Sequence, residues 1–132
     1  MNTRAYLERI NYQGPPTASA QSLRQLHSAH MRTVPFENLD IHLKRPIVLE
    51  DNALFDKIVT RKRGGFCYEL NGLFAALLRA LGFDVVMLSA GVANPEREFG
   101  PDFDHMALLV TLEQSWLADV GFGDSFVELC QS

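Results

Sequence analysis

The sequence has little cysteine, no long apolar run and only a small net charge. Its 132 residues include two cysteines, Cys67 and Cys130, too few for a disulfide framework, and neither belongs to a Cys-x-x-Cys pair. The longest apolar runs, such as residues 73–78, are far too short to span a membrane. The first residues lack an apolar segment of signal-peptide length. These absences predict a soluble, cytoplasmic protein with no membrane partner.

Acidic residues outnumber basic ones, but the two signs are unevenly distributed. Sixteen Asp and Glu residues against twelve Lys and Arg residues give a net charge of −4, with +4 on residues 1–66 and −8 on residues 67–132. A net acidic chain argues against a nucleic-acid partner. The basic half could meet an anionic small molecule, although on charge alone two solvated faces are the favoured interpretation.

The first part of the chain shows the apolar spacing of helices. A first helix, with Tyr6 on its apolar face, is expected to end at the Gly-Pro-Pro segment, residues 14–16. A second helix begins near Thr17 or Ser19, whose hydroxyl would cap it, and ends before Pro35. Its buried face is expected to hold Leu23, Leu26, His27, His30 and Met31.

Two further helices are expected before the pattern changes. One spans Asp51 to Thr60, with Asp51 as its cap and an apolar face at residues 54, 55, 58 and 59. A basic, glycine-bearing loop at residues 61–65 leads to the clearest helix, Cys67 to Leu81, which ends at Gly82.

Strand patterns follow Gly82. Residues 83–88, 105–112 and 115–120 are expected strands, residues 93–104 form a polar loop, and residues 125–130 start another strand. A two-residue hairpin turn at residues 113–114 would put Leu112 opposite Ser115 and Asp119 opposite Leu108. Helices followed by strands predict an α+β fold, in which an N-terminal helical layer packs against an antiparallel sheet.

Cys67 is the first candidate for chemistry. It opens a long helix, whose dipole favours the nucleophilic thiolate, as do the cationic residues 61–63 just before it. Gly64 and Gly65, which Phe66 separates from Cys67, would let a substrate or another backbone approach closely. A buried, inert cysteine is the alternative, and the two interpretations carry equal weight at this position.

His105 is the second candidate. It begins a strand directly after Asp104, so its ring could reach out of the sheet toward a helix N-terminus. Its competitors are His27, His30 and His42, and for any single histidine a packed or exposed role is the ordinary one.

Asp119 is the third candidate, because a carboxylate inside an apolar strand must be paired or hydrogen-bonded if it is buried. The alternative is an edge aspartate that faces solvent, and Asp104 is a rival on the opposite face of its strand from His105. Together Cys67, His105 and Asp119 supply a nucleophile, a base and a carboxylate to orient the base. A zinc site from the same residues lacks paired-ligand spacing, so no metal is expected.

Four motifs in this chain resemble the arylamine N-acetyltransferase family, in the family's order and at its spacing. The resemblance covers nearly the whole chain, and the Arg-Gly-Gly-Phe-Cys motif within it is specific. The four segments are Pro35-Phe36-Glu37-Asn38-Leu39, Arg63-Gly64-Gly65-Phe66-Cys67-Tyr68-Glu69-Leu70-Asn71, Asp104-His105-Met106 and Asp119-Val120-Gly121-Phe122-Gly123.

The resemblance implies a cysteine-proteinase-like core in two parts. Residues 1–82 would form a helical domain that carries the nucleophile, and residues 83–132 part of a β-barrel domain that carries the histidine and the aspartate. Full-length family members continue well beyond this length, completing the barrel and adding a lid-like third domain. The sheet edge left uncovered here predicts self-association.

The resemblance also implies an activity, the acetyl-CoA-dependent acetylation of an arylamine or hydrazine by a ping-pong mechanism through acetylated Cys67. His105 would deprotonate Cys67, and Asp119 would hold the imidazole tautomer. Glu37 and Arg63 match a structural ion pair, and Asn71 matches a supporting hydrogen bond. Positions that line the acceptor pocket in the family, for which core packing is the alternative, are matched by Phe36, Val92 and Phe122.

Two other functions stay open from the sequence. One is a different Cys-His-Asp enzyme, such as a transglutaminase-like or papain-like amidase, against which the match at residues 63–71 argues. The other is a non-catalytic binding or regulatory fragment that associates with a partner.

Overall fold

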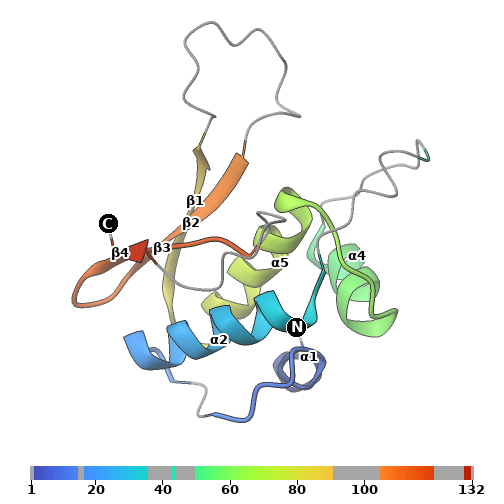
Figure 1. The fold of residues 1–132 in the computed structure, drawn as a ribbon, viewed down its shortest axis with the longest axis horizontal. Coiled ribbons are helices and arrows are strands. Elements are labelled where there is room, and N and C mark those ends of the chain that lie inside the picture. The colour runs from blue at the N-terminus through green and yellow to red at the C-terminus, as the bar shows by residue number, and fades with distance from the viewer. Residues whose placement is uncertain are drawn as a thin grey trace, which may run out of the picture.

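The computed structural model of this chain describes residues 2–14, 17–35, 43, 50–90, 105–120 and 130–131. At residues 67, 88–90, 105, 106, 130 and 131 it describes the backbone and not the side chain. Helices come first and strands last, which confirms the α+β prediction (Figure 1). The elements are α1 (Thr3–Arg9), α2 (Ala20–Thr33), α4 (Asp51–Phe55), the π-helix η1 (Asp56–Thr60), α5 (Cys67–Ala80), β1 (Asp84–Ala90), β2 (His105–Thr111), β3 (Ser115–Ala118) and β4 (Cys130–Gln131).

Polar side chains cap the first two helices. The Asn2 side-chain oxygen accepts a hydrogen bond from the Ala5 amide at 3.1 Å, and the Ser19 hydroxyl accepts one from the Ser22 amide at 3.2 Å. Of the two predicted capping residues, Thr17 and Ser19, the N-cap is Ser19. The predicted end of the first helix is wrong, because the chain already leaves the helix at Asn11, whose φ of 58° is left-handed.

The third predicted helix is found over its whole predicted length, but in two geometries. α4 passes into the π-helix η1 at Asp56, and together they cover residues 51–60. The predicted cap is wrong by one residue: Glu50 occupies the N-cap position and Asp51 is the first helical residue, with no hydrogen bond from a capping side chain. Asp51 still lies in the first turn, where the helix dipole favours a negative charge.

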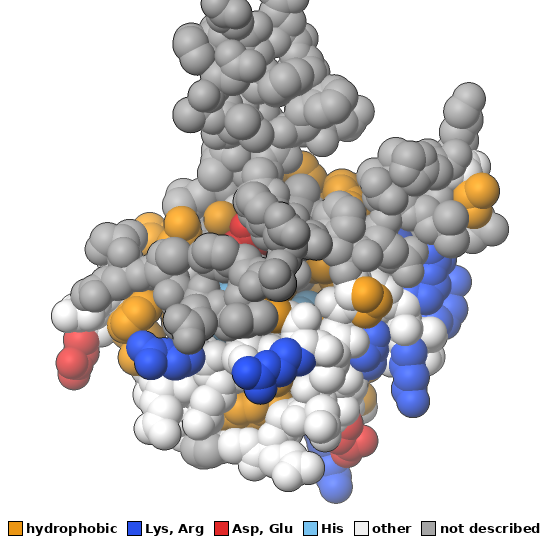
Figure 2. Space-filling view, in the orientation of Figure 1, with side chains coloured by type: hydrophobic (Ala, Val, Ile, Leu, Met, Phe, Trp, Pro, Cys, Tyr) orange, Lys and Arg blue, Asp and Glu red, His pale blue; other side chains and the backbone are white. Residues whose placement is uncertain are grey.

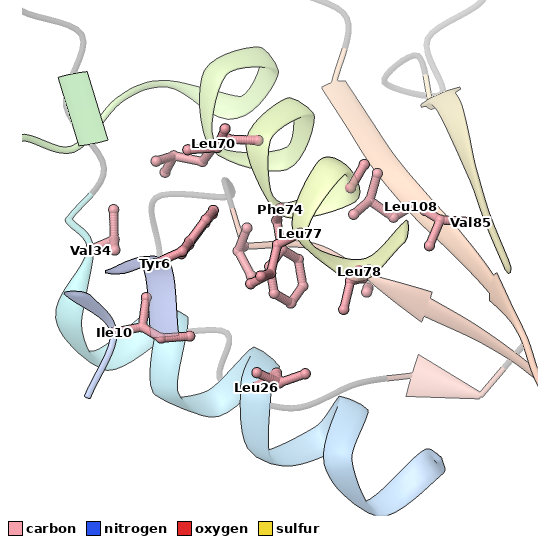
Figure 3. Close-up of a cluster of buried hydrophobic side chains, with 14 of the residues drawn as sticks. Tyr6, Ile10, Leu26, Val34, Leu70, Phe74, Leu77, Leu78, Val85 and Leu108 are labelled. Atoms are coloured by element: carbon pink, nitrogen blue, oxygen red, sulfur yellow. The ribbon is translucent and has the colours of Figure 1, made fainter. Parts of the chain in front are cut away.

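α5 lies at the centre of the hydrophobic core, where Figure 3 shows its side chains between those of α1 and α2 and those of β1 and β2. It has the predicted start and ends at Ala80, after which Gly82 takes a φ of +99°. Because one cluster joins helices and strands, the described parts of residues 1–82 and 83–132 share a core, and their division into two domains stays a prediction. The largest fully buried apolar side chains are Tyr6, Ile10, Leu23, Leu26, Leu54, Ile58, Leu70, Leu73, Phe74, Leu77, Leu78 and Leu108.

The four strands form one antiparallel sheet in the order β1-β2-β3-β4, which is not closed within the described residues. The predicted hairpin register is wrong by one residue, since Thr111 pairs with Ser115 and leaves a three-residue loop. A two-residue turn favours residues that tolerate positive φ, such as Asn-Gly, and Glu113-Gln114 is a poor choice for it. Leu112, the first residue of this loop, packs against the core. Ala118, and not Asp119, therefore lies opposite Leu108.

The two faces of the sheet differ. Leu108 and Ala118 are fully buried and belong to the core that α5 shares. On the other face, Val86 and Leu117 are 49% and 37% exposed. Self-association of the chain stays a prediction, because the structure holds a single copy. No helix in the described ranges is long and apolar enough to cross a membrane.

Basic side chains gather on one side of the molecule. Figure 2 shows most of the blue side chains of that view at its right, where Figure 1 places α4. Arg61 and Lys62, in the loop that leads to α5, are both exposed. The loop that precedes Cys67 in the sequence is therefore part of the positively charged half of the chain, residues 1–66.

Candidate active site

The candidate nucleophile occupies the first position of α5. Phe66 is the N-cap residue, and its amide donates a hydrogen bond to Glu69 Oε1 at 3.1 Å. Cys67 follows as the first helical residue, where the unpaired amides of the first turn create a positive potential. A thiolate at this position would be stabilised by the backbone.

The glycines before Cys67 lie where side chains do not fit. A Cβ on Gly64 would lie 1.8 Å from the Pro35 carbonyl oxygen, and the same oxygen accepts a hydrogen bond from the Gly65 amide at 3.3 Å. A Cβ on Gly65 would lie 2.8 Å from Glu69 Oε1. The close approach expected of these glycines is therefore made by another backbone segment at Gly64 and by a buried carboxylate at Gly65.

Two further contacts hold this loop on the helices beneath it. The Arg63 amide donates to the Lys57 carbonyl at 3.0 Å. Arg9, in α1, donates to the Arg63 carbonyl at 3.3 Å and to the Ile58 carbonyl at 2.7 Å. The proposed partner of Arg63, Glu37, lies outside the described residues, so the ion pair between them stays a prediction. The backbone of the loop is fixed by groups from α1 and η1.

A buried ion pair, which the sequence reasoning missed, lies directly behind the loop. Lys57 Nζ donates to both carboxylate oxygens of Glu69, at 3.0 and 2.9 Å. The two side chains are only 5% and 4% exposed. Local sequence gave no signal for it, because helical periodicity puts Lys57 outside the apolar face at residues 54, 55, 58 and 59, where a solvated lysine is ordinary.

Asp119 is buried and held by the helix that carries Cys67. It is 9% exposed, so the solvent-facing alternative is wrong. Its Oδ1 accepts a hydrogen bond from Asn71 Nδ2 at 2.9 Å, and the Asn71 side-chain oxygen accepts one from the Val120 amide at 2.9 Å. Asn71 lies one helical turn after Cys67, so the two positions share one face of α5. That face is directed toward the end of β3.

His27 contacts the same aspartate from the opposite side of the chain. Its Nε2 lies 3.0 Å from the Asp119 carbonyl oxygen and 3.4 Å from the Asp119 amide, and its side chain is fully buried. The predicted burial of His27 on the second helix is confirmed, although it was otherwise considered as a competitor of His105. Its role here is to join α2 to the backbone at Asp119.

The other candidate residues are located less completely. His105 is the first residue of β2. Three residues further along the same strand, Leu108 pairs with Ala118, the residue before Asp119. The side chains of Cys67 and His105 are not among those described. Phe36, Val92 and Phe122, the predicted pocket residues, lie outside the described residues, as do Asp104 and His42.

The described side chains form no group of three histidine, cysteine, aspartate or glutamate residues that could hold a metal ion. The zinc site considered from the sequence would use the side chains of Cys67 and His105, which the structure does not describe. The chemistry that the arrangement supports is nucleophilic: a cysteine lies at a helix N-terminus, and Asn71, one turn along the same helix face, holds the buried carboxylate of Asp119.

Comparison with known proteins assigns the family. The family model described as N-acetyltransferase matches residues 19–131. An arylamine N-acetyltransferase from Escherichia coli strain K12 is 44% identical over 119 residues, which are 89% of this chain and 42% of that protein. This chain therefore spans less than half the length of that relative.

Solved structures agree with the sequence comparison. The arylamine N-acetyltransferase of Salmonella typhimurium matches with a TM-score of 0.88 at 40% identity, over 98% of this chain and 48% of that one. The enzyme of Mycobacterium marinum in complex with CoA matches with a TM-score of 0.82 at 41% identity, over 92% of this chain and 46% of that one. These matches confirm the resemblance drawn from the four motifs. The chain belongs to the arylamine N-acetyltransferase family.

Proposed function

We propose that this chain transfers an acetyl group from acetyl-CoA to an arylamine or hydrazine through an acetylated Cys67. The observation that carries the proposal is the buried Asp119 carboxylate, fixed by Asn71 one turn along α5 from Cys67. A buried carboxylate held in one orientation by a hydrogen bond is suited to orienting an imidazole. Membership of the family supports the same assignment.

In the first half of the proposed reaction, His105 takes the proton of the Cys67 thiol. The thiolate attacks the carbonyl carbon of the acetyl-CoA thioester, and a new C–S bond forms. The bond to the coenzyme sulfur then breaks, and the imidazolium returns its proton to that sulfur. Free CoA leaves and acetyl-Cys67 remains.

In the second half, the nitrogen of the acceptor attacks the acetyl carbon and its proton passes to His105. The C–S bond to Cys67 breaks, and the proton returns to the cysteine sulfur, or stays on the imidazole beside a thiolate. Asp119 accepts a hydrogen bond from the imidazole and keeps the basic nitrogen directed at the sulfur. The backbone amide of Cys67, at the helix N-terminus, is a suitable donor to the oxyanion that forms in both halves.

The substrates follow from the relatives. The Mycobacterium marinum relative was solved in complex with CoA, and the names of the relatives specify arylamines as acceptors. We propose the same donor for this chain, and an aromatic amine or a hydrazine as acceptor. No metal ion enters the proposed steps.

The proposal is tested by intact mass measurement. Incubation of the 132-residue chain with acetyl-CoA should add one acetyl group, and a later addition of an arylamine should remove it. The Cys67→Ala variant should gain none, whereas the matched Cys130→Ser variant should acetylate as the wild type does. Absence of the adduct while the Cys67 thiol remains titratable would favour the non-catalytic alternative. An adduct that persists in Cys67→Ala would overturn the assignment of the nucleophile.

A further inference from the structure

The buried pair of Lys57 and Glu69 connects the middle of the loop that leads to Cys67 with the end of that loop. On one side, the Lys57 carbonyl accepts the Arg63 amide at 3.0 Å. On the other, Lys57 Nζ donates to both oxygens of Glu69, and Glu69 accepts the amide of Phe66. A single residue of η1 thus holds the middle of the loop by its backbone and the end of the loop through a carboxylate.

The pair also determines the charge near the nucleophile. Glu69 is the third residue of α5, two positions after Cys67, and is 3% exposed. A buried carboxylate is little screened by water, so an uncompensated negative charge there would oppose the formation of a thiolate at the start of the same helix. Lys57 lies within 3.0 Å of both oxygens and cancels that charge.

We propose that Lys57 is a positioning residue for Cys67, which neutralises Glu69 so that Glu69 can hold the N-terminus of α5 without disfavouring the Cys67 thiolate. The inference rests on the proposed function, since it assumes that Cys67 is the nucleophile. Each partner needs the other: Glu69 accepts the Phe66 amide as a capping group, and Lys57 removes the electrostatic penalty of a carboxylate at that place.

The two single substitutions should act in opposite directions. Lys57→Met leaves the carboxylate uncompensated, so the pKa of the Cys67 thiol should rise. Glu69→Gln keeps an oxygen for the Phe66 amide but removes the buried negative charge two positions after Cys67, so the pKa of that thiol should fall. The double variant carries no charge at either position and should return close to the wild type. If the pair had a purely structural role, all three variants should shift the pKa of the Cys67 thiol in the same direction.

The experiment measures alkylation of Cys67 by iodoacetamide against pH, in a Cys130→Ser background that leaves one thiol. The midpoint for Lys57→Met should lie about one pH unit above that of the parent, which is about a tenfold slower reaction on the acidic side. Arg24→Met, which removes an exposed charge from α2, is the matched control and should leave the midpoint unchanged. Far-ultraviolet circular dichroism establishes that each variant is folded.

The proposal is overturned if the two single variants shift the midpoint in the same direction, or if neither differs from the double variant. Should Lys57→Met fail to fold, the comparison of Glu69→Gln with the double variant decides: a midpoint below that of the double variant supports the proposal, and an equal one refutes it. Because alkylation needs no acetyl donor, this result is independent of whether the chain forms an acetyl adduct. Failure of the proposed function and failure of this inference are therefore distinguishable.

Discussion

Acidification below neutral pH should destabilise this protein through His30. The imidazole is fully buried in α2, with Nε2 2.7 Å from the Tyr6 hydroxyl and its ring edge-on to Phe74 at a centroid distance of 5.0 Å. Burial, with smaller contributions from the neighbouring His27 and from Arg9, lowers the pKa of His30 to about 3. The ring is therefore neutral in the folded chain at every pH at which the protein would ordinarily be studied.

The sign follows from comparing the folded and unfolded states. In the unfolded chain the pKa of His30 is near 6.5, so between pH 6.5 and about 3 the unfolded state binds a proton that the folded state excludes. The stabilising contribution is complete above pH 6.5 and decreases as the pH falls toward 3. Between pH 7 and pH 5, this single group should lower the free energy of unfolding by about 2 kcal/mol.

Urea unfolding at pH 7 and at pH 5, followed by the fluorescence of the single tryptophan, Trp116, measures this difference. The His30→Gln variant cannot take up the proton, so its loss of stability between the two pH values should be about 2 kcal/mol smaller than that of the wild type. Tyr6→Phe removes the hydroxyl contact but leaves the imidazole buried. It is the matched control and should keep the dependence of the wild type.

Tyr6 itself does not titrate in this range, because burial raises the pKa of its hydroxyl well above the usual value. Carboxyl groups contribute to acid sensitivity in every variant, and comparison with His30→Gln removes their common part. If wild type and His30→Gln lose the same stability between pH 7 and pH 5, burial of a neutral His30 is not what makes the fold acid-sensitive.

Two substitutions test the surroundings of the candidate active site. Gly64→Ala should destabilise the chain by about 1–3 kcal/mol in thermal unfolding. The new Cβ would lie 1.8 Å from the Pro35 carbonyl oxygen, so the backbone must move. A loss of stability below about 0.5 kcal/mol would contradict this packing. Asn71→Ala removes the donor to the buried Asp119 carboxylate and should cost about 1–3 kcal/mol or more in urea unfolding, whereas Asn52→Ala, at an exposed site in α4, should stay within about 0.5 kcal/mol of the wild type. Equal effects of the two Asn→Ala substitutions would argue against a structural role for the Asn71 amide.

Much of the helical half could be predicted from local sequence. Ser19 as a cap, Gly82 as a terminator and the apolar face that includes Leu26 are all found as predicted, because capping and helical periodicity depend on residues within a few positions of one another. The same reasoning placed the start of α5 at Cys67. Family membership also followed from short motifs, and the comparisons confirmed it.

The predictions that failed depended on competition between distant groups or on backbone conformations without a strong sequence signal. The hairpin register was wrong by one residue because Glu113-Gln114 carries no strong turn signal, and the loop that forms has three residues. The first helix ended early because Asn11 adopts a left-handed conformation that asparagine permits but does not require. The roles of Cys67 and His105 stay predictions, since their side chains are not described.

The sequence by itself determined the order of helices and strands, the helix that Cys67 begins and the family to which the chain belongs. Only the tertiary structure decided that Asp119 faces Asn71 and that Lys57 is buried against Glu69. The physical reason is sequence separation: these pairs join segments 48 and 12 residues apart, and no local pattern records such a contact. A buried charge is stable only beside its partner, and folding is what brings the partner there.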